Sequence, residues 1–524
     1  MKKIISLVLS LIMVLSVASI GLTAFADDGK SGYCGADGDN LAWSLNDGVL
    51  TISGTGDMEN FSDDGNLADR MVPWHNVYAP DETIKEVVIE PGVTSIGGEA
   101  FYELKALEKV TIPDTVTKIG WWAFYRCSKL TDITIPENVT FIGERAFSLT
   151  GVSEMNLPKI VKISDYAFES SALEKITLGD NVEEIGISAF LNSKYYKNEN
   201  NWEDGALYIG NAFIAFNDTD AKSYSVKEGT RIIGKWAFQK YRMALEEITL
   251  PSSLEVLPMS TFDTLLFKYK DSGKYDIFIP ENVKKVVNDY HFGNYINSIK
   301  VSAKNTVYDS RNNCNAIIET KKNRMIIACN KTTIPNTVKT IGSNAFYGIN
   351  EKEYLYIPKS VVRVEAYAFG LMSKLRAVYY AGSSNDWKKI RITYQKGEKE
   401  SYKYADSDYS TNDVLYYTLR YYNCTPIKVK QLTKGKKSFT VKYNKLGSAN
   451  GYQIKYSTDK NFKNDVHYVS VKGNKTFKRT IKGLKSNKKY YVRVRGWRVE
   501  KRNNINKGKN IYSNWSTVKT VTTK

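Results

Sequence analysis

Short hydrophobic segments of one kind recur along the chain, and each alternates apolar with polar residues. Three of them are "LEKVTIP" (residues 107–113), "LTDITIP" (130–136) and "LEKITLG" (173–179). In the first, Val110 and Ile112 are separated by one polar residue, which is the period-two pattern of a short strand with one buried face. Proline has no N–H to donate, so we expect the strand to end at the proline where one closes the segment.

A second segment follows each strand and has its own fixed pattern. In "VTKIGWWAFYRCS" (residues 116–128), we expect Ile119 to enter the core and Gly120 to permit a tight bend. We expect "WWAF" to form about one helical turn that places Phe124 inside. This phenylalanine recurs at intervals of 21–24 residues, with two longer intervals of 48 and 84 residues, at Phe101, Phe124, Phe147, Phe168, Phe190, Phe238, Phe262, Phe346 and Phe369. One unit cannot bury its apolar face alone, so the pattern predicts a solenoid of stacked units with short parallel strands about 4.8 Å apart.

The repeated segments resemble the BspA-like leucine-rich repeat family of secreted bacterial surface proteins. The resemblance rests on the recurrent "IPxxVTxIGxxAF", on "LAWSLNDGVLTISGTGDM" (residues 41–58) and on "AVYYAGSSNDWKKI" (377–390), and it covers nearly all of residues 34–424. It implies adhesion or ligand binding at the cell surface and brings no catalytic residues with it. We therefore expect an N-terminal cap over residues 27–82 and a leucine-rich-repeat solenoid over residues 83–424.

The first 26 residues have the features of a secretory signal peptide. Lys2 and Lys3 precede a long apolar stretch, and "AFA" (residues 24–26) matches the small-x-small pattern of a cleavage site. An uncleaved membrane anchor is the alternative interpretation. No later stretch approaches the ~18–20 apolar residues that a membrane span needs. We expect a bacterial protein that is secreted or held at the cell surface, with no membrane span after signal removal.

Positive charge is concentrated in the C-terminal part of the chain. Residues 426–524 contain 27 Lys and Arg residues against three acidic residues, a net charge of +24, which leaves −6 for the rest of the +18 chain. The same stretch contains short alternating segments at regular spacing. The placement of Tyr490, Val492 and Val494 is similar to the tyrosine corner of a fibronectin type III domain. We expect residues 425–524 to form an all-β, fibronectin type III-like sandwich.

The cysteines and histidines do not predict a metal centre. The three histidines are far apart, and none of the five cysteines has metal-ligand spacing. Cys314 and Cys329 flank a predicted hairpin, and two interpretations remain open for them: a disulfide across the hairpin, or a pair of buried thiols, which we favour. The cysteines are Cys34, Cys127, Cys314, Cys329 and Cys424.

Two motifs come close to known sites and then depart from them. "GTRIIGKW" (residues 229–236) begins like a phosphate-binding loop but has Trp236 where a hydroxyl side chain is needed. "DSDYSTND" (residues 406–413) lacks the glycine and the closing glutamate of a calcium loop. We therefore expect no enzyme activity, no cofactor and no metal site, and we expect no nucleic-acid partner for an exported protein.

Outward-facing strand positions form two columns along the predicted solenoid, and the second column includes Glu86, Lys109, Asp132 and Tyr354. Threonine dominates the early repeats of the first column and aromatic residues dominate the later ones: Val88, Thr111, Thr134, Asn156, Thr177, Thr249, Phe278, Lys300, Tyr356 and Tyr379. Exposed aromatic rings on a rigid sheet suit stacking on sugars or holding a peptide. Phe278, Tyr354, Tyr356 and Tyr379 are therefore our candidate ligand-binding residues. The alternative, which we favour, is that tyrosine stands there because of its strand propensity.

The sequence as a whole predicts a binding protein. The solenoid would recognise a protein or glycan ligand at a cell or host surface, and the basic C-terminal domain would aid retention on polyanionic surfaces such as an anionic cell-wall polymer. The alternative function is that of a structural or scaffold protein of the cell envelope.

Overall fold

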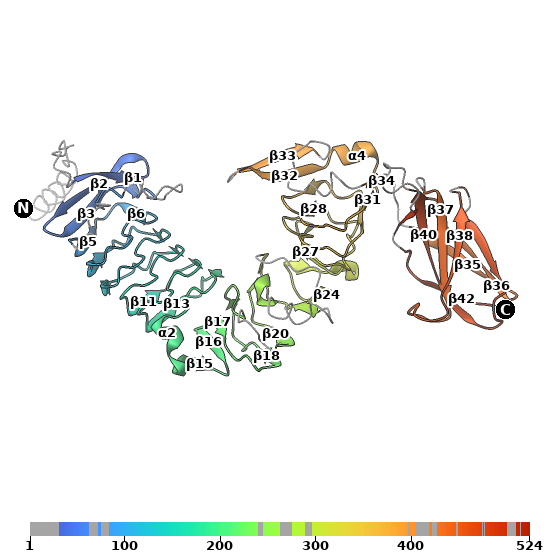
Figure 1. Cartoon of the computed structure of the whole chain (residues 1–524), viewed down its shortest axis with the longest axis horizontal. Coiled ribbons are helices and arrows are strands. Elements are labelled where there is room, and N and C mark those ends of the chain that lie inside the picture. Colours follow the sequence, from blue (N-terminus) through green and yellow to red (C-terminus); the bar gives the residue numbers. More distant parts are fainter. Residues whose placement is uncertain are drawn as a thin grey trace, which may run out of the picture. The chain divides into compact units, whose positions relative to one another are not determined.

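The structure is a computed structural model in which the chain forms two units, and each unit is described by itself (Figure 1). The first unit contains residues 1–220 and 229–243, and the second contains residues 221–228 and 244–524. The structure describes residues 31–61, 72–74, 83–238, 245–262, 275–288, 296–396, 399–404, 419–421, 427–446, 449–473, 475, 477–499, 510–513 and 515–524. The predicted signal peptide (residues 1–26), the acidic run 406–413, Cys424, His75 and His291 lie outside the described residues.

Each turn of the solenoid contributes two short strands, one before and one after the proline segment, and the two kinds of strand form separate parallel sheets. The first sheet begins with an antiparallel hairpin: β1 (Ser31–Gly35), β2 (Gly38–Asn46), β3 (Val49–Gly54), β5 (Glu86–Ile89), β7 (Lys109–Thr111) and β9 (Asp132–Ile133). β11 (Glu154–Leu157) and β13 (Lys175–Leu178) continue the same pattern. The second sheet contains β4 (Gly56–Asp57), β6 (Val93–Ile96), β8 (Lys118–Ile119), β10 (Phe141–Ile142), β12 (Lys162–Ile163) and β14 (Glu184–Ile185).

An irregular insertion interrupts the first unit after its fifth phenylalanine turn. It comprises α2 (Lys194–Lys197), the 3₁₀ turn Glu199–Asn201, β15 (Trp202–Glu203), β16 (Ala206–Ile209) and β17 (Ala212–Phe216), after which β19 (Ile232–Ile233) resumes the repeat. β16 and β17 pair antiparallel, and β17 pairs parallel with β19. The segment 229–236 that begins like a phosphate loop is part of this repeat, and its Lys235 contacts Glu184 at 2.6 Å.

The second unit continues the solenoid. Its elements are β18 (Ser223–Ser225), β20 (Glu247–Thr249), β21 (Val256–Pro258), the 3₁₀ turn Met259–Phe262, β22 (Tyr275–Ile279), β23 (Lys285–Val287), β24 (Ile296–Val301), β25 (Tyr308–Asp309), the 3₁₀ turn Arg311–Asn313, β26 (Ala316–Glu319), β27 (Arg324–Ala328), β28 (Thr340–Ile341), β29 (Tyr354–Ile357), β30 (Arg363–Val364), β31 (Ala377–Tyr380), α4 (Ser384–Lys388), β32 (Arg391–Lys396), β33 (Lys399–Tyr404) and β34 (Leu419–Tyr421). Across the described residues between 86 and 380, the repeat makes about 12 solenoid turns.

The predicted outward columns are in register. Lys109 pairs with Glu86 on one side and with Asp132 on the other, and the Lys109 ammonium contacts the Glu86 carboxylate at 2.8 Å. In the second unit, Tyr354 pairs with Ala377 and Tyr356 pairs with Tyr379. A one-residue slip would move every side chain to the other face, so the buried alternate positions fix this register.

The phenylalanines of the repeat form the core, as the sequence predicts. All nine are buried. In the first unit they stack from Phe101 through Phe124, Phe147 and Phe168 to Phe190, with ring centroids 5.2–5.6 Å apart. Offset aromatic stacking adds about 0.5–1.5 kcal/mol per pair to the stabilisation from burial.

The segments around the five phenylalanines from Phe101 to Phe190 are not the helical turns that the sequence predicts, whereas Phe262 ends the 3₁₀ turn Met259–Phe262. Each of the five consists of β-turns in which two non-glycine residues four apart adopt a left-handed backbone, such as Trp122 (φ 56°) and Arg126 (φ 61°). This conformation costs roughly 1–2 kcal/mol for a residue with a Cβ. In compensation, Trp122 and Arg126 each donate a backbone hydrogen bond to the following turn, at 2.7 Å to Glu144 and 3.0 Å to Ser148. The stacking of turns therefore decides the local conformation.

A separate β-domain ends the second unit. One sheet contains β35 (Val429–Gly435), β36 (Ser438–Tyr443) and β39 (Lys478–Lys482). The other contains β37 (Gly451–Ser457), β38 (His467–Lys472), β40 (Lys489–Val499), β41 (Asn510–Tyr512) and β42 (Lys519–Thr522). Both sheets are antiparallel and share one hydrophobic core, which includes Phe439, Tyr452 and Val492.

Candidate ligand site beside the C-terminal domain

The structure separates Phe278 from the three tyrosines of the candidate site. Phe278 lies in β22, which pairs with β24, and its side chain is 55% exposed. Tyr354, Tyr356 and Tyr379 lie in β29 and β31, which belong to another sheet. The four residues therefore do not form one patch within the described part of the sheets.

The tyrosines differ from the sequence expectation in their exposure, because the C-terminal domain covers them. Tyr379 is 7% exposed and belongs to the same hydrophobic cluster as Phe439 and Tyr452 of that domain. Its hydroxyl donates a hydrogen bond of 3.1 Å to the backbone carbonyl of Tyr512. Tyr354 and Tyr356 are half-buried against the same cluster. Sequence columns alone do not reveal this cover, because the residues that supply it follow some 50 to 130 positions later.

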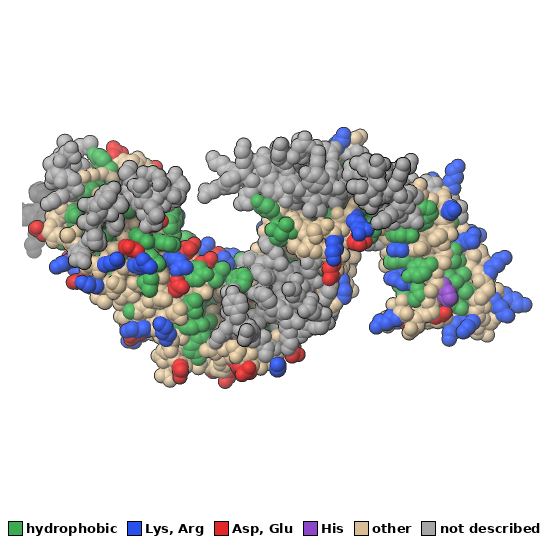
Figure 2. All heavy atoms as spheres, viewed as in Figure 1, with side chains coloured by type: hydrophobic (Ala, Val, Ile, Leu, Met, Phe, Trp, Pro, Cys, Tyr) green, Lys and Arg blue, Asp and Glu red, His purple; other side chains and the backbone are tan. Residues whose placement is uncertain are grey.

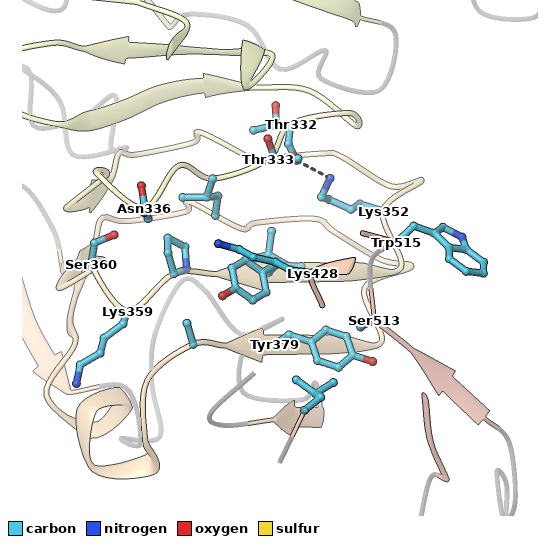
Figure 3. Close-up of a pocket in the computed structure, with 16 residues that line it drawn as sticks. Thr332, Thr333, Asn336, Lys352, Lys359, Ser360, Tyr379, Lys428, Ser513 and Trp515 are labelled. Carbon is cyan, nitrogen blue, oxygen red and sulfur yellow. Dashed lines mark hydrogen bonds between the residues drawn. The ribbon is translucent and has the colours of Figure 1, made fainter. Parts of the chain in front are cut away.

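A cavity of about 600 Å³ lies where the last repeats meet the C-terminal domain (Figure 3). We call it the junction pocket. Two of the predicted site residues, Tyr356 and Tyr379, are in its wall. The full lining is Thr332, Thr333, Ile334, Asn336, Lys352, Leu355, Tyr356, Pro358, Lys359, Ser360, Tyr379, Ala381, Lys428, Leu446, Ser513 and Trp515. This volume is within the 300–1,000 Å³ that is usual for small-molecule sites.

Lys352 is the most constrained cation of the junction pocket. Its ammonium donates hydrogen bonds to the backbone carbonyls of Asn330, at 2.6 Å, and Thr332, at 3.0 Å, and Figure 3 shows the second of these. Burial lowers the pKa of Lys352 to about 8, because the charged form loses hydration there. The two carbonyls favour the charged form, so the side chain is mainly an ammonium at neutral pH.

Stacked arginines fix the position of Trp515 on the C-terminal side of the pocket. The guanidinium of Arg495 lies 4.3 Å from the Trp515 ring and 3.7 Å from the Tyr512 ring. Arg493 lies 5.0 Å from the Trp515 ring and 4.4 Å from the Phe462 ring. Burial lowers the pKa of both guanidinium groups, which nevertheless remain charged.

Sequence reasoning missed Lys352, Lys428 and Trp515 as pocket residues. Lys352 belongs to no repeated column, and Trp515 lies in "YSNWS" (residues 512–516), which the sequence suggests only as the last strand of the C-terminal domain. The one sequence signal for a pocket residue was the tryptophan among the basic residues of the C-terminal domain, because arginine side chains commonly stack on aromatic rings.

Four cysteines are described, and all are buried free thiols. The favoured interpretation of Cys314 and Cys329 as a buried thiol pair is confirmed, and the disulfide is wrong. Ala316 pairs with Ala328 in the hairpin, which places the two cysteines one residue out of register. Burial raises the pKa of Cys314 to about 11 and that of Cys34 to about 12, so both thiols stay protonated at neutral pH.

Among the described residues, neither a metal-binding cluster nor a membrane-spanning helix is present. In the part of the chain that the structure describes, no three His, Cys, Asp or Glu side chains come together as a metal cluster. Within the same residues, no helix has both the length and the apolar character that crossing a bilayer requires.

Comparison with known proteins identifies a repeat family. The sequence model described as "BspA type Leucine rich repeat region (6 copies)" matches residues 75–197, 203–318 and 316–391, which together exceed half of the chain. No curated protein matches the sequence.

Three solved structures are similar to the chain. A leucine rich cell surface protein from Faecalibacterium prausnitzii is 21% identical over 67% of this chain and 96% of that protein, with a TM-score of 0.23. A leucine-rich repeat protein from Eubacterium ventriosum is 20% identical over 65% of this chain and 70% of that protein, with a TM-score of 0.21. The pneumococcal vaccine antigen PcpA is 14% identical over 69% of this chain and 93% of that protein, with a TM-score of 0.23.

Proposed function

Because the chain belongs to the BspA-type leucine-rich repeat family, we propose that it is a non-enzymatic binding and adhesion protein, secreted or held at the cell surface. Proteins of this family are typically cell-surface repeat proteins without catalysis. In this proposal the N-terminal segment directs export, the solenoid recognises a protein or glycan ligand, and the basic C-terminal domain helps retain the protein on a polyanionic surface such as a cell-wall polymer.

The observation that carries the proposal is a row of like charges on the outer face of the three-stranded sheet. Lys442 in β36 stands directly opposite Lys478 in β39, and Lys482 stands opposite Ser438. All three lysines are exposed. Directly opposed like charges destabilise a sheet, so the Lys442–Lys478 pair does not stabilise the fold. A polyanion lying along the face would relieve their repulsion.

The surroundings of this row strengthen its attraction for anions. The hydroxyls of Thr440 and Thr480 lie 2.8 Å apart between the lysine positions, on the same face. The stretch from residue 426 contains only Asp459, Asp465 and Glu500 as acidic residues. Figure 2 shows Lys and Arg side chains distributed over the visible face of this domain, with little acidic surface beside them.

We also infer that the C-terminal domain is fibronectin type III-like. Two antiparallel sheets of three and five strands over one core support this interpretation. So does the hydroxyl of Tyr490, which accepts a hydrogen bond of 3.2 Å from the backbone N–H of Lys485 upstream of it, as in a tyrosine corner. Tyr443 occupies a fully buried core position and packs on Tyr452.

Retention on purified bacterial cell walls tests the proposal. The full chain is compared with a variant in which Lys442, Lys478 and Lys482 are replaced by glutamine, over a series of salt concentrations. We expect the variant to bind about 3- to 100-fold more weakly at low salt, because exposed ion pairs contribute ~0.2–1 kcal/mol each. We also expect its binding to depend less on salt, because fewer charges are screened.

A variant of equal charge provides the control. Lys105, Lys129 and Lys304 are exposed lysines of the solenoid, and their replacement by glutamine changes the net charge by the same amount. We expect it to bind walls as the unmodified chain does. Equal weakening in both variants would show that net charge acts without a specific face. Salt-independent binding would contradict electrostatic retention and favour the scaffold alternative.

A further inference from the structure

We propose that the junction pocket binds an anionic sugar, with Tyr356 and Tyr379 contacting the ring and lysines from both domains holding the negative group. The inference rests on the proposed function and deepens it, because it names a ligand class for the solenoid. It concerns a site separate from the lysine row of the three-stranded sheet.

Charge complementarity is the first argument. Among the described residues, three lysines line the pocket, and no aspartate or glutamate does. Of the three, Lys359 contacts Asp386 at 3.2 Å, at the edge of α4. Lys352 comes from the solenoid and Lys428 from the C-terminal domain, so both parts of the second unit contribute a positive group to the lining (Figure 3). An anion is the ligand that such a wall favours, because the positive charges attract an anion and repel a cation.

The hydrogen bonding of Lys352 is the second argument. An ammonium has three N–H donors, and two of them are occupied by the carbonyls of Asn330 and Thr332. Within the described residues no third partner is found, so one donor remains for a ligand. The two carbonyls also hold the side chain in place, and the entropy cost of ordering it is met before the ligand arrives.

The aromatic wall is the third argument and selects a sugar among anions. Tyr356 and Tyr379 stand side by side on β29 and β31, and the rest of that wall includes Leu355 and Pro358. Sugar rings present C–H groups that pack on tyrosine faces, whereas a bare inorganic anion gains nothing from them. The hydroxyl of Ser360 and the amide of Asn336 supply hydrogen bonds suited to sugar hydroxyls.

The pocket is held open by contacts that do not involve a ligand. Tyr379 is tied to the backbone of Tyr512, and Trp515 is packed by the guanidinium groups of Arg493 and Arg495. Arg495 in turn donates hydrogen bonds of 2.9 and 2.7 Å to the side-chain oxygen of Gln453. A site fixed in this way loses little conformational freedom on binding.

Binding should depend on pH through Lys352. Its lowered pKa of about 8 means that the ammonium is present below pH 8 and is lost as the pH rises through that value. Anion affinity should therefore fall between pH 7 and 9, whereas an ordinary exposed lysine would stay charged to about pH 10.4. Burial raises the pKa of Cys329 and of Tyr354, so neither gains charge over this range. The other titratable groups of the pocket wall and of the segments beside it are Lys331, Glu351, Glu353, Tyr356, Lys359, Tyr379, Asp386, Lys428 and Arg495.

Calorimetric titration of the full chain tests the inference with three probes: an oligouronate of two to four units, a sugar monophosphate, and the neutral oligosaccharide that matches the oligouronate. We expect saturable binding of at least one charged probe at 150 mM salt, and at least tenfold weaker binding of the neutral one. Comparison of the oligouronate with the sugar monophosphate decides whether the bound negative group is a carboxylate or a phosphate. Failure of both charged probes to bind would overturn the inference.

Substitutions then locate the site. We expect Lys352→Met and, separately, the exposed Lys428→Gln to weaken binding of the charged probe about tenfold, and Lys352→Met to abolish the loss of affinity between pH 7 and 9. Lys428→Gln guards against a folding defect, because that side chain is exposed. Unchanged affinity in both variants would place the ligand elsewhere.

The lysine-row variant (Lys442, Lys478 and Lys482 to glutamine) separates this inference from the proposed function. It should lose wall retention and keep sugar binding. Wall retention without binding of the charged sugars would overturn the junction site and leave the adhesion proposal intact.

Discussion

Glycine is required at Gly120 and Gly143 for a reason that the residue pattern does not give. Gly120 was expected to supply a bend, yet its φ is not positive. A Cβ at Gly120 would lie 2.5 Å from the backbone nitrogen of Gly98 in the preceding turn, and one at Gly143 would lie 2.4 Å from the backbone of Gly120. The glycines therefore permit close approach of consecutive turns. The sequence predicts where glycine must stand, but the contact is between residues about 23 positions apart and is invisible locally.

Gly120→Ala should destabilise the first unit by about 1–3 kcal/mol, the usual cost of forcing extra atoms into a packed site. Gly234→Ala is the matched control, since Gly234 has the same place in its repeat and its nearest atom to a Cβ is 3.5 Å away. We expect the control to be neutral or slightly stabilising, because alanine restricts the unfolded chain. Urea unfolding followed by tryptophan fluorescence measures both. Equal effects of the two changes would refute close approach as the cause.

At the scale of the elements, strands were easier to predict than turns. The proline and the alternation of Val110 with its neighbours located β7, whose last residue is Thr111, before Pro113. The segment "WWAF" around Phe124 was predicted to form about one helical turn that places the ring inside. Its left-handed residues are stabilised by hydrogen bonds to the next turn, and such bonds exist only once the turns are stacked. The hydrogen bonds to the neighbouring repeat therefore outweigh the local conformational preference of the residues.

Phe147→Ala should cost about 3–5 kcal/mol, the usual range for a buried aromatic residue. It removes a ring that stacks on Phe124 at 5.2 Å and on Phe168 at 5.6 Å. Because repeats are stabilised by their nearest neighbours, hydrogen exchange should accelerate in the turns on both sides. Tyr125→Ala is the comparison, because the Tyr125 side chain is half-exposed, and it should lower the free energy of unfolding by roughly 1 kcal/mol. Exchange that speeds up only within the substituted turn would contradict nearest-neighbour coupling.

At the scale of the whole molecule, the boundary between the solenoid and the basic domain is where sequence prediction was least complete. The solenoid and the C-terminal β-domain can each be predicted from their own sequence patterns. Tyr379, however, belongs to the solenoid and contributes to the hydrophobic core of the C-terminal domain. A column of outward tyrosines looks exposed when only its own sheet is considered. The half of the pocket supplied by Lys428 and Trp515 could not be predicted, because nothing in the repeat period specifies which surface of the next domain meets the last turn.

Tyr379→Ala should loosen the C-terminal domain within the full chain. It empties a buried position and removes the hydrogen bond to Tyr512, so we expect the exchange of β40 amides to accelerate by an amount equivalent to about 3 kcal/mol. Tyr379→Phe keeps the ring and should cost only about 0.5–1.5 kcal/mol. If the alanine variant leaves β40 as protected as the unmodified chain does, the two parts do not stabilise each other.

The hydrogen bonds between consecutive phenylalanine turns of the first unit run one way. From Glu99 to Ser170, the described N–H groups of the phenylalanine turns donate to the carbonyls of the following turn, ending at Leu191. Aligned peptide dipoles add, as they do in an α-helix. In the phenylalanine turns the N–H groups point toward the C-terminal side, so this row of bonds has an electric polarity opposite in sense to that of a helix along its chain. The bonds that precede each turn, such as the 2.9 Å bond from the Gly120 N–H to the Ile96 carbonyl, point the other way, so the two edges of the stack have opposite polarity.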